Sequence, residues 1–248
     1  MVVDFTTSMS GSKNFANPKQ LRWWERIKEA YNYNMNNPGE ARIPRVIHQI
    51  WLGKSMPADI ERYVDSIKKT NPTFEHRLWT DKDVEAFDFA NKHLFFQTPN
   101  VGQRSDILRY AILEKMGGVY LDADFQGYNS FESLLHLNLF AGVSYDAEPV
   151  LFNGLIGSVP NHPIIQAINK ELEPKHGDGM AVIGSTGPYF FTKKFYKHFN
   201  ESDKIVALPL TYFYPYPNFA QDKIYGDDLA KYIKPETICA HLWHSSWN

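Results

Sequence analysis

The chain has 248 residues, of which 43% are hydrophobic and 22% are charged, and its formal net charge is −2. This composition is typical of a globular protein with one sizeable core, and the scattered charges offer no basic face for binding nucleic acid. The single cysteine, Cys239, excludes an internal disulfide and a cysteine-built zinc site, and no apolar run approaches the ~20 residues of a membrane-spanning helix.

The N-terminus "MVVDFTTSMSGSK" has no basic start followed by an apolar stretch, so it does not read as a secretory signal. We expect a soluble, cytoplasmic protein with no nucleic-acid partner.

The first forty residues predict a loose polar end followed by a helix. Leu21, Trp24, Ile27 and Tyr31 recur at helical spacing after Pro18. The stretch "NNPGEARIP" then indicates a linker. We therefore divide the chain into residues 1–40, a loose end and helix, and residues 41–248, the main domain.

Strands and helices are expected to alternate from there on. "RVIHQIWL" and "FEHRLWT" read as strands, and "PADIERYVDSIKKTNP" between them reads as an amphipathic helix. Asp81 and Asp83 follow Thr80 at the start of the next helix, where acidic side chains favour the helix dipole. We interpret this Asp-x-Asp as helix capping.

The stretch 102–118 predicts a helix with an apolar stripe that ends at Gly117. Asp106 and Arg109 lie three residues apart, on one face near its start. The strand "VYLDAD" follows at once and carries a second Asp-x-Asp, Asp122 and Asp124.

The remaining elements complete an α/β pattern. Strands are expected around 139–145, 149–159 and 238–243, helices in 162–172 and 188–199, and an irregular loop in "LTYFYPYPNF". This order favours a largely parallel sheet. Ligands bind such sheets beyond the carboxyl ends of the strands, which is where Asp122 and Asp124 would lie.

Two neighbouring carboxylates at a buried strand end are costly to ionise unless a cation compensates them. Mg²⁺ or Mn²⁺ would do so and would also bind phosphate oxygens, which suits a nucleotide diphosphate. The same spacing suits the nucleophile and acid of a phosphatase.

Three stretches in order and spacing carry a resemblance to a known family. "IPRVIHQIWLG", "SDILRYAILEKMGGVYLDAD" and "HLWHSSW" resemble the signature blocks of the DXD sugar-binding glycosyltransferases, glycosyltransferase family 32. That family includes fungal mannosyltransferases and is related to the glucosylating domains of large clostridial toxins. The resemblance implies a GT-A type nucleotide-sugar transferase fold, Rossmann-like, with a mostly parallel sheet flanked by helices and here a small N-terminal helical extension.

The resemblance also implies roles for the first two blocks. Trp51 matches the indole that stacks on the donor base, with Ile50 beside it, and the alternative is that Trp51 fills the core. Asp106 and Arg109 match the pair that contacts the ribose and the transferred sugar, and the alternative is a plain intrahelical ion pair. Asp122 and Asp124 match the metal-binding pair. With Asp106 and Arg109 they form the implied catalytic group.

Further positions follow from the same resemblance. Ala123 belongs to the donor-binding stretch, with its side chain pointing away from the metal. Asn153, Ser185, Thr186 and Gly187 resemble blocks that line the donor sugar and the acceptor, although Gly154 and Gly187-Pro188 also suit a turn and a helix start. His241 or His244 would give a third metal ligand, Ser246 a hydroxyl to the β-phosphate or metal, and Trp247 an indole N–H to phosphate. Asp227 and Asp228 are weaker candidates that equally suit a helix cap.

The implied function is metal-dependent transfer of a hexose, with retention of anomeric configuration, from a nucleotide diphosphate sugar to a glycan or glycolipid hydroxyl. Mn²⁺ or Mg²⁺ is the expected cofactor, a UDP-hexose is the favoured donor and GDP-mannose the alternative. Weak membrane association stays open. One rival is a phosphatase or phosphotransferase, which would place Asp-x-Asp on the first strand with Thr or Ser where Gln126 stands. The other is a carbohydrate-binding relative without activity.

Overall fold

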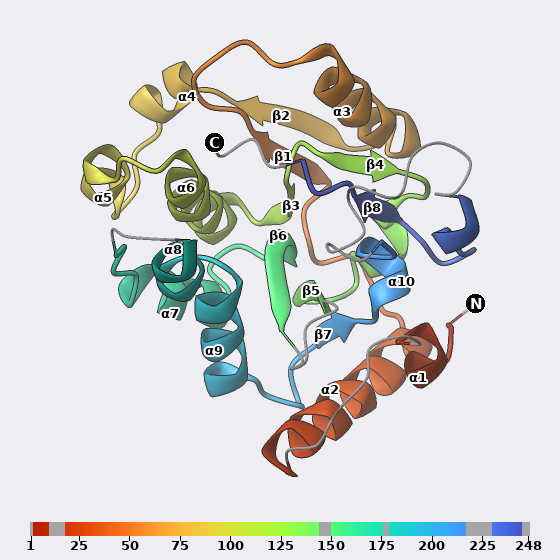
Figure 1. Ribbon diagram of the computed structural model, residues 1–248. Helices are drawn as coiled ribbons and strands as arrows, with labels where there is room; N and C mark the ends of the chain where they lie inside the picture. The colour runs from red at the N-terminus through yellow and green to blue at the C-terminus, as the bar shows by residue number, and fades with distance from the viewer. Residues whose placement is uncertain (1, 10–17, 144–149, 176–178, 217–229, 245–248) are drawn as a thin grey trace.

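The computed structural model of the protein describes residues 2–9, 18–143, 150–175, 179–216 and 230–244. A six-stranded sheet with the strand order β2-β1-β3-β6-β5-β7 lies at its centre (Figure 1). Its strands are β1 (Val46–Ile50), β2 (Glu75–Trp79), β3 (Gly118–Leu121), β5 (Leu139–Val143), β6 (Leu151–Ser158) and β7 (Ile205–Leu208). A two-stranded sheet pairs β4 (Phe125–Gly127) with β8 (Cys239–His241).

The central sheet is mostly parallel, as predicted. β1 pairs in parallel with β2 and β3, and β5 with β7, whereas β6 runs antiparallel to both of its neighbours, β3 and β5. The reversed direction of β6 matters for the site, because the beginning of β6 meets the carboxyl ends of β1 and β3 at one edge of the sheet.

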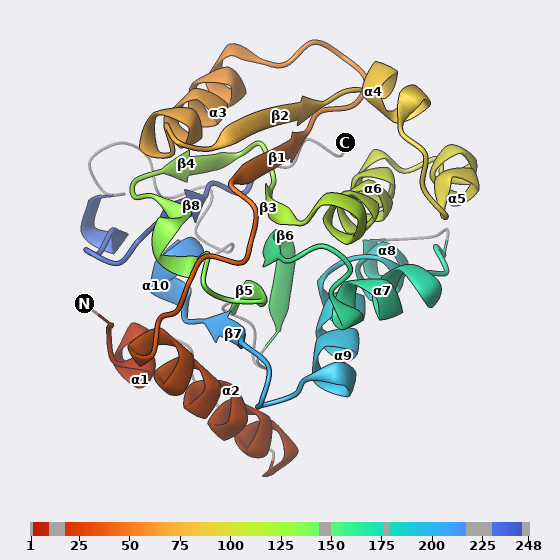
Figure 2. The ribbon, with the colours of Figure 1, turned by 180° about the vertical axis from the view of Figure 1, so that it is seen from behind.

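Helices flank the sheet on both sides, with α6 to α9 grouped together and α3 lying on the other side, over β2 and β4 (Figures 1 and 2). They are α1 (Phe5–Ser8), α2 (Pro18–Asn36), α3 (Ala58–Thr70), α4 (Asp81–Ala86), α5 (Lys92–Gln97), α6 (Val101–Met116), α7 (Pro163–Lys170), α8 (Gly179–Ser185), α9 (Pro188–His198) and α10 (Leu210–Phe213), with a 3-10 turn at Phe131–Leu134.

Most predicted elements are present, and the differences have local causes. The strand predicted at 238–243 forms β8, but it pairs with β4 outside the central sheet. The aromatic stretch predicted as an irregular loop begins with α10. Five short elements, α1, α5, β4, α8 and β7, were not predicted from the sequence. An apolar run as short as Ile205–Leu208 fits a strand or a buried turn equally well.

Residues 2–9 pack against the domain, contrary to the expected loose end. The side chain of Phe5 is buried and contacts the rings of Trp24 and Tyr31. Tyr31 donates a hydrogen bond to the carbonyl of Val3 (3.0 Å). α2 packs along β7 and contributes Ile27 to the same core as the sheet. The domain boundary near residue 41 stays a proposal.

The first Asp-x-Asp caps α4, as predicted. Oδ2 of Asp83 accepts hydrogen bonds from the backbone N–H (2.8 Å) and the hydroxyl (2.6 Å) of Thr80. Oδ2 of Asp81 accepts a hydrogen bond from the backbone N–H of Gly53 (2.7 Å). Asp83 therefore caps α4, whereas the carboxylate of Asp81 binds the backbone of the loop that follows β1.

A glycine pair joins α6 to β3. Gly117 and Gly118 have φ angles of 63° and 94°, a region that L-residues with a side chain rarely adopt. A Cβ on Gly118 would lie 2.6 Å from the carbonyl oxygen of Val46 on β1. The turn therefore needs glycine, and it sends the chain directly from α6 into the strand that ends at Asp122.

Candidate functional site

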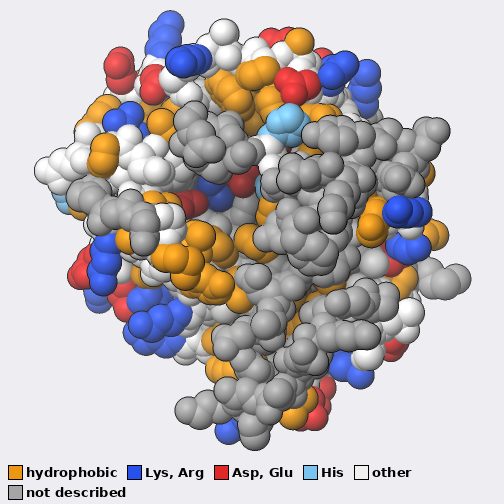
Figure 3. Space-filling model, in the orientation of Figure 1, with side chains coloured by type: hydrophobic (Ala, Val, Ile, Leu, Met, Phe, Trp, Pro, Cys, Tyr) orange, Lys and Arg blue, Asp and Glu red, His pale blue; other side chains and the backbone are white. Residues whose placement is uncertain are grey.

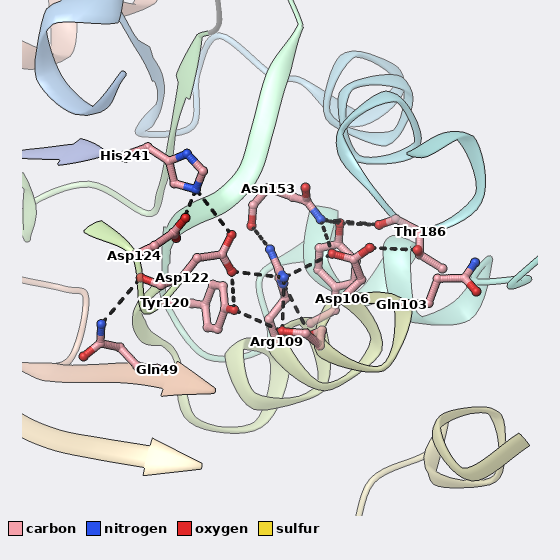
Figure 4. A network of polar contacts seen from close by, with 12 residues as sticks. Gln49, Gln103, Asp106, Arg109, Tyr120, Asp122, Asp124, Asn153, Thr186 and His241 are labelled. Atoms are coloured by element: carbon pink, nitrogen blue, oxygen red, sulfur yellow. Dashed lines mark hydrogen bonds and ion pairs between the residues drawn. The ribbon is translucent and has the colours of Figure 1, made fainter. Parts of the chain in front are cut away.

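Arg109 on α6 lies at the centre of a buried polar network (Figure 4). Its side chain is 2% exposed, and Nη2 lies 3.2 Å from Oδ1 of Asp106 and 3.2 Å from Oδ1 of Asp122. Nη1 donates to the carbonyl oxygen of Asn153 on β6 (2.7 Å). The guanidinium group thus joins α6, the end of β3 and the start of β6, which is more than an intrahelical ion pair.

Asp106 is held by groups from two further elements. Nδ2 of Asn153 donates to its Oδ1 (2.7 Å), and the hydroxyl of Thr186 donates to its Oδ2 (2.8 Å). Burial raises the pKa of the Asp106 carboxyl, while Arg109 and these two donors act in the opposite direction. Oδ1 already faces both Asn153 and Arg109, so Oδ2 is the oxygen that keeps a lone pair able to accept from a ligand hydroxyl.

Tyr120 belongs to the same network and was not foreseen from the sequence. Its hydroxyl donates to Oδ1 of Asp122 (2.6 Å), and the guanidinium carbon of Arg109 lies 4.5 Å from the centre of its ring. Because alternate residues of a strand face the same side, its position two residues before Asp122 is the signal that could have found it.

Asp122, Asp124 and His241 come together as a candidate metal site. One ligand atom from each lies within 4.8 Å of the other two. Nε2 of His241 lies 3.2 Å from Oδ1 of Asp124 and 4.0 Å from Oδ2 of Asp122. The pairing of β4 with β8, which sets Phe125 opposite His241, brings these side chains together.

The structure distinguishes between the two histidines named as the third ligand. The ring of His244 faces α3, with Nε2 3.8 Å from Oδ2 of Asp59 and the ring centre 5.9 Å from that of Tyr63. His244 reaches the site only through its backbone N–H, which donates to Oδ2 of Asp124 (2.9 Å). His241 is therefore the histidine whose ring lies beside both aspartates.

The pKa values of Asp122 and Asp124 are shifted in opposite directions. Burial raises the pKa of the Asp122 carboxyl. Burial acts in the same direction on Asp124, but the charge and hydrogen bond of His241 outweigh it and hold the pKa of Asp124 below its ordinary value. Burial alone would lower the pKa of His241, and Asp124 raises it. The site thus favours a positive charge between the two carboxylates.

This donor set fits a hard divalent cation. Carboxylate oxygens with one imidazole nitrogen suit Mn²⁺, and carboxylates alone suit Mg²⁺. Asp106 and Asp122 share the guanidinium of Arg109, and Asp124 lies beside His241, so three carboxylates accompany one guanidinium group in the cluster. A Cβ on Gly154 would lie 2.7 Å from Oδ2 of Asp122, so glycine leaves space beside that oxygen.

Two cavities meet at this cluster, and Asp122 and His241 line both of them. The first cavity is lined by Trp51, Ile50 and Ala123, among other residues. Trp51 is partly buried, and its indole Nε1 donates to the carbonyl oxygen of Lys54 (2.7 Å). Ala123 packs against Ile60 and Val64 of α3.

The second cavity contains Asp106, Arg109 and Asn153, with Val182 and Ile183 of α8. Ser185, the last residue of α8, and Thr186, which follows it, form hydrogen bonds to Gln103 and Asp106 on α6. Ser185 accepts from Nε2 of Gln103 (3.2 Å), and Gly187 is the N-cap of α9. A turn was one of the two interpretations of Gly154, but this residue lies within β6.

Two aromatic residues of the second cavity were also missed. Oη of Tyr214 is buried and has no hydrogen-bond partner among the described residues. Trp243 has φ 57°, an uncommon conformation for a bulky residue, and its indole donates to the carbonyl of Tyr216 (3.0 Å). Ser246, Trp247, Asp227 and Asp228 lie outside the described residues.

Comparison with known proteins identifies relatives over most of the chain. Residues 57–141 match a family model described as "Glycosyltransferase sugar-binding region containing DXD motif". A glycosyltransferase of Acanthamoeba polyphaga mimivirus, itself uncharacterized, is 30% identical over 217 residues, which cover 83% of this chain and 84% of that protein. Inositol phosphoceramide mannosyltransferase 3 of Schizosaccharomyces pombe is 31% identical over 180 residues, 67% of this chain. The match spans about half (49%) of that yeast protein.

Solved structures share the fold at low sequence identity. The PaToxG glycosyltransferase superposes with a TM-score of 0.52 at 21% identity, covering 72% of this chain and 80% of that one. The catalytic domain of alpha-toxin from Clostridium novyi gives a TM-score of 0.54 at 9% identity, covering 91% of this chain and 81% of that one. Within the described part of the chain, no helix is long and apolar enough to cross a membrane.

Proposed function

Because the chain belongs to the family of glycosyltransferases whose sugar-binding region contains a DXD motif, we propose that it transfers a hexose from a nucleotide diphosphate sugar to a glycan or glycolipid hydroxyl with the help of a divalent metal ion. One observation carries the proposal: Asp122 and His241 line both cavities. A donor with its base in the Trp51 cavity and its sugar in the Arg109 cavity would have its diphosphate beside the carboxylates.

In this proposal the first cavity binds the nucleotide. Nε1 of Trp51 donates a hydrogen bond to the carbonyl oxygen of Lys54, which fixes the orientation of the indole ring for stacking on a base. Base stacking on an aromatic ring contributes ~1–3 kcal/mol in comparable systems. Ile50 and Ala123 supply apolar contacts at the same cavity. Ser246 and Trp247 remain proposed contacts of the phosphates.

Asp122, Asp124 and His241 would hold Mn²⁺ or Mg²⁺. Such an ion, when bound, would neutralise the negative charge that develops on the departing nucleotide diphosphate. The same charge would be met by Arg109, which is buried and fixed by Asp106, Asp122 and the Asn153 carbonyl. A hydrogen-bond donor that is held rigidly in a buried site stabilises developing charge more effectively than a mobile one in water.

Asp106, Arg109 and Asn153 would bind the transferred sugar. Asp106 accepts hydrogen bonds from Asn153 and Thr186, and a remaining lone pair can accept a hydrogen bond from a sugar hydroxyl. During transfer the bond between C1 of the sugar and the diphosphate oxygen breaks, the acceptor oxygen bonds to C1, and the proton of the acceptor hydroxyl passes to the departing diphosphate oxygen. We propose that this occurs on the same face, with retention, since the described residues that line the two cavities include no carboxylate besides those assigned to the metal and the sugar.

The names of the relatives favour one identity for the sugar of the donor. Several of them are mannosyltransferases by name, including the inositol phosphoceramide enzyme of fission yeast and the mannosyl phosphorylinositol ceramide synthase SUR1 of Saccharomyces cerevisiae, 31% identical over 166 residues. Their names favour mannose, hence GDP-mannose, over the UDP-hexose that the sequence analysis preferred. They also favour a lipid-linked polyol hydroxyl as the acceptor. We rank GDP-mannose first and UDP-glucose second.

The experiment is thermal unfolding of the chain with GDP-mannose or UDP-glucose, with and without MnCl₂, followed by assay of released sugar. A ligand at a hundredfold excess over its Kd stabilises the folded state by about 2.7 kcal/mol, so the expected result is a rise in Tm that requires both nucleotide sugar and Mn²⁺. Absence of any rise and of any released sugar would overturn the proposal. Binding without release would support the inactive relative, and phosphate release from a simple phosphoester would support the phosphatase.

A further inference from the structure

The cavity that contains Asp106 and Arg109 is bordered by a helix without any charged side chain. α8 has the sequence GMAVIGS, and Val182 and Ile183 line the cavity. Met180 on the same helix is 62% exposed. Figure 3 shows hydrophobic side chains gathered over α8, beside a hollow in which acidic and basic side chains are visible.

A second apolar side chain stands at the neighbouring cavity. Val101, the first residue of α6, is 40% exposed and lines the cavity of Trp51. We call Val101, Met180, Val182 and Ile183 the apolar rim. Single exposed hydrophobic residues are common on soluble proteins, but a group of them around a binding cavity marks an interaction surface.

Polar residues that suit a lipid interface continue from the apolar rim along α9. Tyr189, directly after the cavity residue Pro188, is 42% exposed, and Lys193 is exposed one helical turn later. Residues four apart share a helix face, so Tyr189 and Lys193 point in similar directions. Tyrosine is enriched at the headgroup level of bilayers, and lysine is attracted to anionic lipids.

We propose that the apolar rim docks on the surface of a lipid bilayer and turns the second cavity towards the lipid headgroups. The identification of a headgroup hydroxyl as acceptor rests on the proposed function, whereas docking can be measured without any sugar transfer. The occupant of the rim is the interfacial region of the bilayer. Apolar side chains enter it, and Lys193 meets its negative charge.

The test is co-sedimentation of the full chain with phosphatidylcholine vesicles that contain phosphatidylinositol. Met180→Asp places a charge in the apolar rim without touching the cavity lining, and it should weaken vesicle binding by about tenfold. Tyr33→Asp is the matched control, because Tyr33 is also an exposed hydrophobic side chain (68%) but lies on α2. It should bind vesicles like the wild type.

Sugar release from the donor without vesicles separates the two proposals. Wild type and Met180→Asp should release sugar at equal rates, which shows that the variant is folded. Wild-type protein that does not sediment with vesicles, or Met180→Asp that sediments equally well, would overturn docking. A change from oligomer to monomer in Met180→Asp with unchanged vesicle binding would also overturn it, since the rim would then join copies of the chain. Failure of the wild type to release sugar would count against the proposed function alone.

Discussion

Nε2 of His241 lies 3.2 Å from Oδ1 of Asp124, although the two residues are far apart in the sequence. The contact exists because β8 pairs with β4, which directly follows Asp124. It sets the charge of the candidate metal site, since His241 holds the pKa of Asp124 below its ordinary value. The predictions that follow test this site and the framework that supports it.

Asp124→Asn should abolish metal-dependent donor binding and reduce sugar transfer by at least about a hundredfold, in line with the loss of one fixed group that stabilises developing charge. The side chain keeps its size and loses its charge, so the fold should persist. Transfer rates and nucleotide binding measured across a range of Mn²⁺ concentrations provide the check.

Asp83→Asn is the matched control, because it changes the same residue type in the other Asp-x-Asp. Asp83 caps α4 through Thr80, so this variant should lose about 1 kcal/mol of stability or less and keep its metal response. If both variants transferred sugar at the wild-type rate, the assignment of the metal to Asp124 would be wrong.

Gly154→Ala should weaken Mn²⁺ binding and transfer, by about tenfold or more, through displacement of Asp122. The added Cβ would lie 2.7 Å from Oδ2 of Asp122, closer than nonbonded atoms approach. The displacement of one active-site group by a fraction of an ångström is known to reduce rates strongly. Calorimetric titration with MnCl₂ measures the affinity directly.

Gly184→Ala supplies the comparison for Gly154. A Cβ on Gly184 meets no atom within 4 Å, and Gly184 lies in α8, where alanine is the better helix former by roughly 0.5–1 kcal/mol. We expect it to raise the Tm slightly and to leave Mn²⁺ affinity unchanged. Equal Mn²⁺ affinities for the two variants would show that the space beside Asp122 has no role.

Tyr214→Phe should raise the KM for the donor by about tenfold and leave stability unchanged or higher. The Tyr214 hydroxyl is buried without a hydrogen-bond partner among the described residues, in the cavity proposed for the sugar. Burial raises the pKa of this hydroxyl, so it stays protonated and able to donate. Removal of a buried polar group without a partner costs the fold nothing. An unchanged KM with a lowered Tm would instead assign the hydroxyl a structural role.

His48 should make stability depend on pH. Burial lowers its pKa to about 4 from 6.5, with Nδ1 accepting from Trp79 (3.2 Å) and Nε2 3.0 Å from the Gly117 carbonyl. The unfolded chain therefore binds more protons, and the stability that neutral His48 provides is complete above pH 6.5 and is lost as the pH falls towards 4. The loss near pH 5 should be about 2 kcal/mol.

Urea unfolding near pH 7 and near pH 5 measures this loss. His48→Gln keeps one acceptor and one donor but cannot titrate, so its stability should fall by about 2 kcal/mol less than that of the wild type over the same interval. His76 is half-buried, and its partial burial lowers its pKa to about 4, but its contribution cancels in the difference. Parallel pH dependence in the two proteins would contradict the role of His48.

Local pattern was enough to predict the elements that carry the site. Helical spacing predicted α2, α3 and α6, a compact β-rich apolar run predicted β1, and alternation predicted β2. Position in these elements also separated the two Asp-x-Asp pairs, because Asp83 begins a helix and Asp122 follows a strand. Helix periodicity and capping depend on residues within a few positions of one another, so the sequence contains this information directly.

The tertiary structure alone decided which side chains meet. The direction of β6 brings the carbonyl of Asn153 to Arg109, and the pairing of β8 selects His241 in place of His244. It also brings Tyr214 into the second cavity and leaves its hydroxyl without a hydrogen-bond partner among the described residues. These relationships depend on hydrogen bonds and packing between segments far apart in the chain, and no local period of hydrophobic residues records which strand a segment will join.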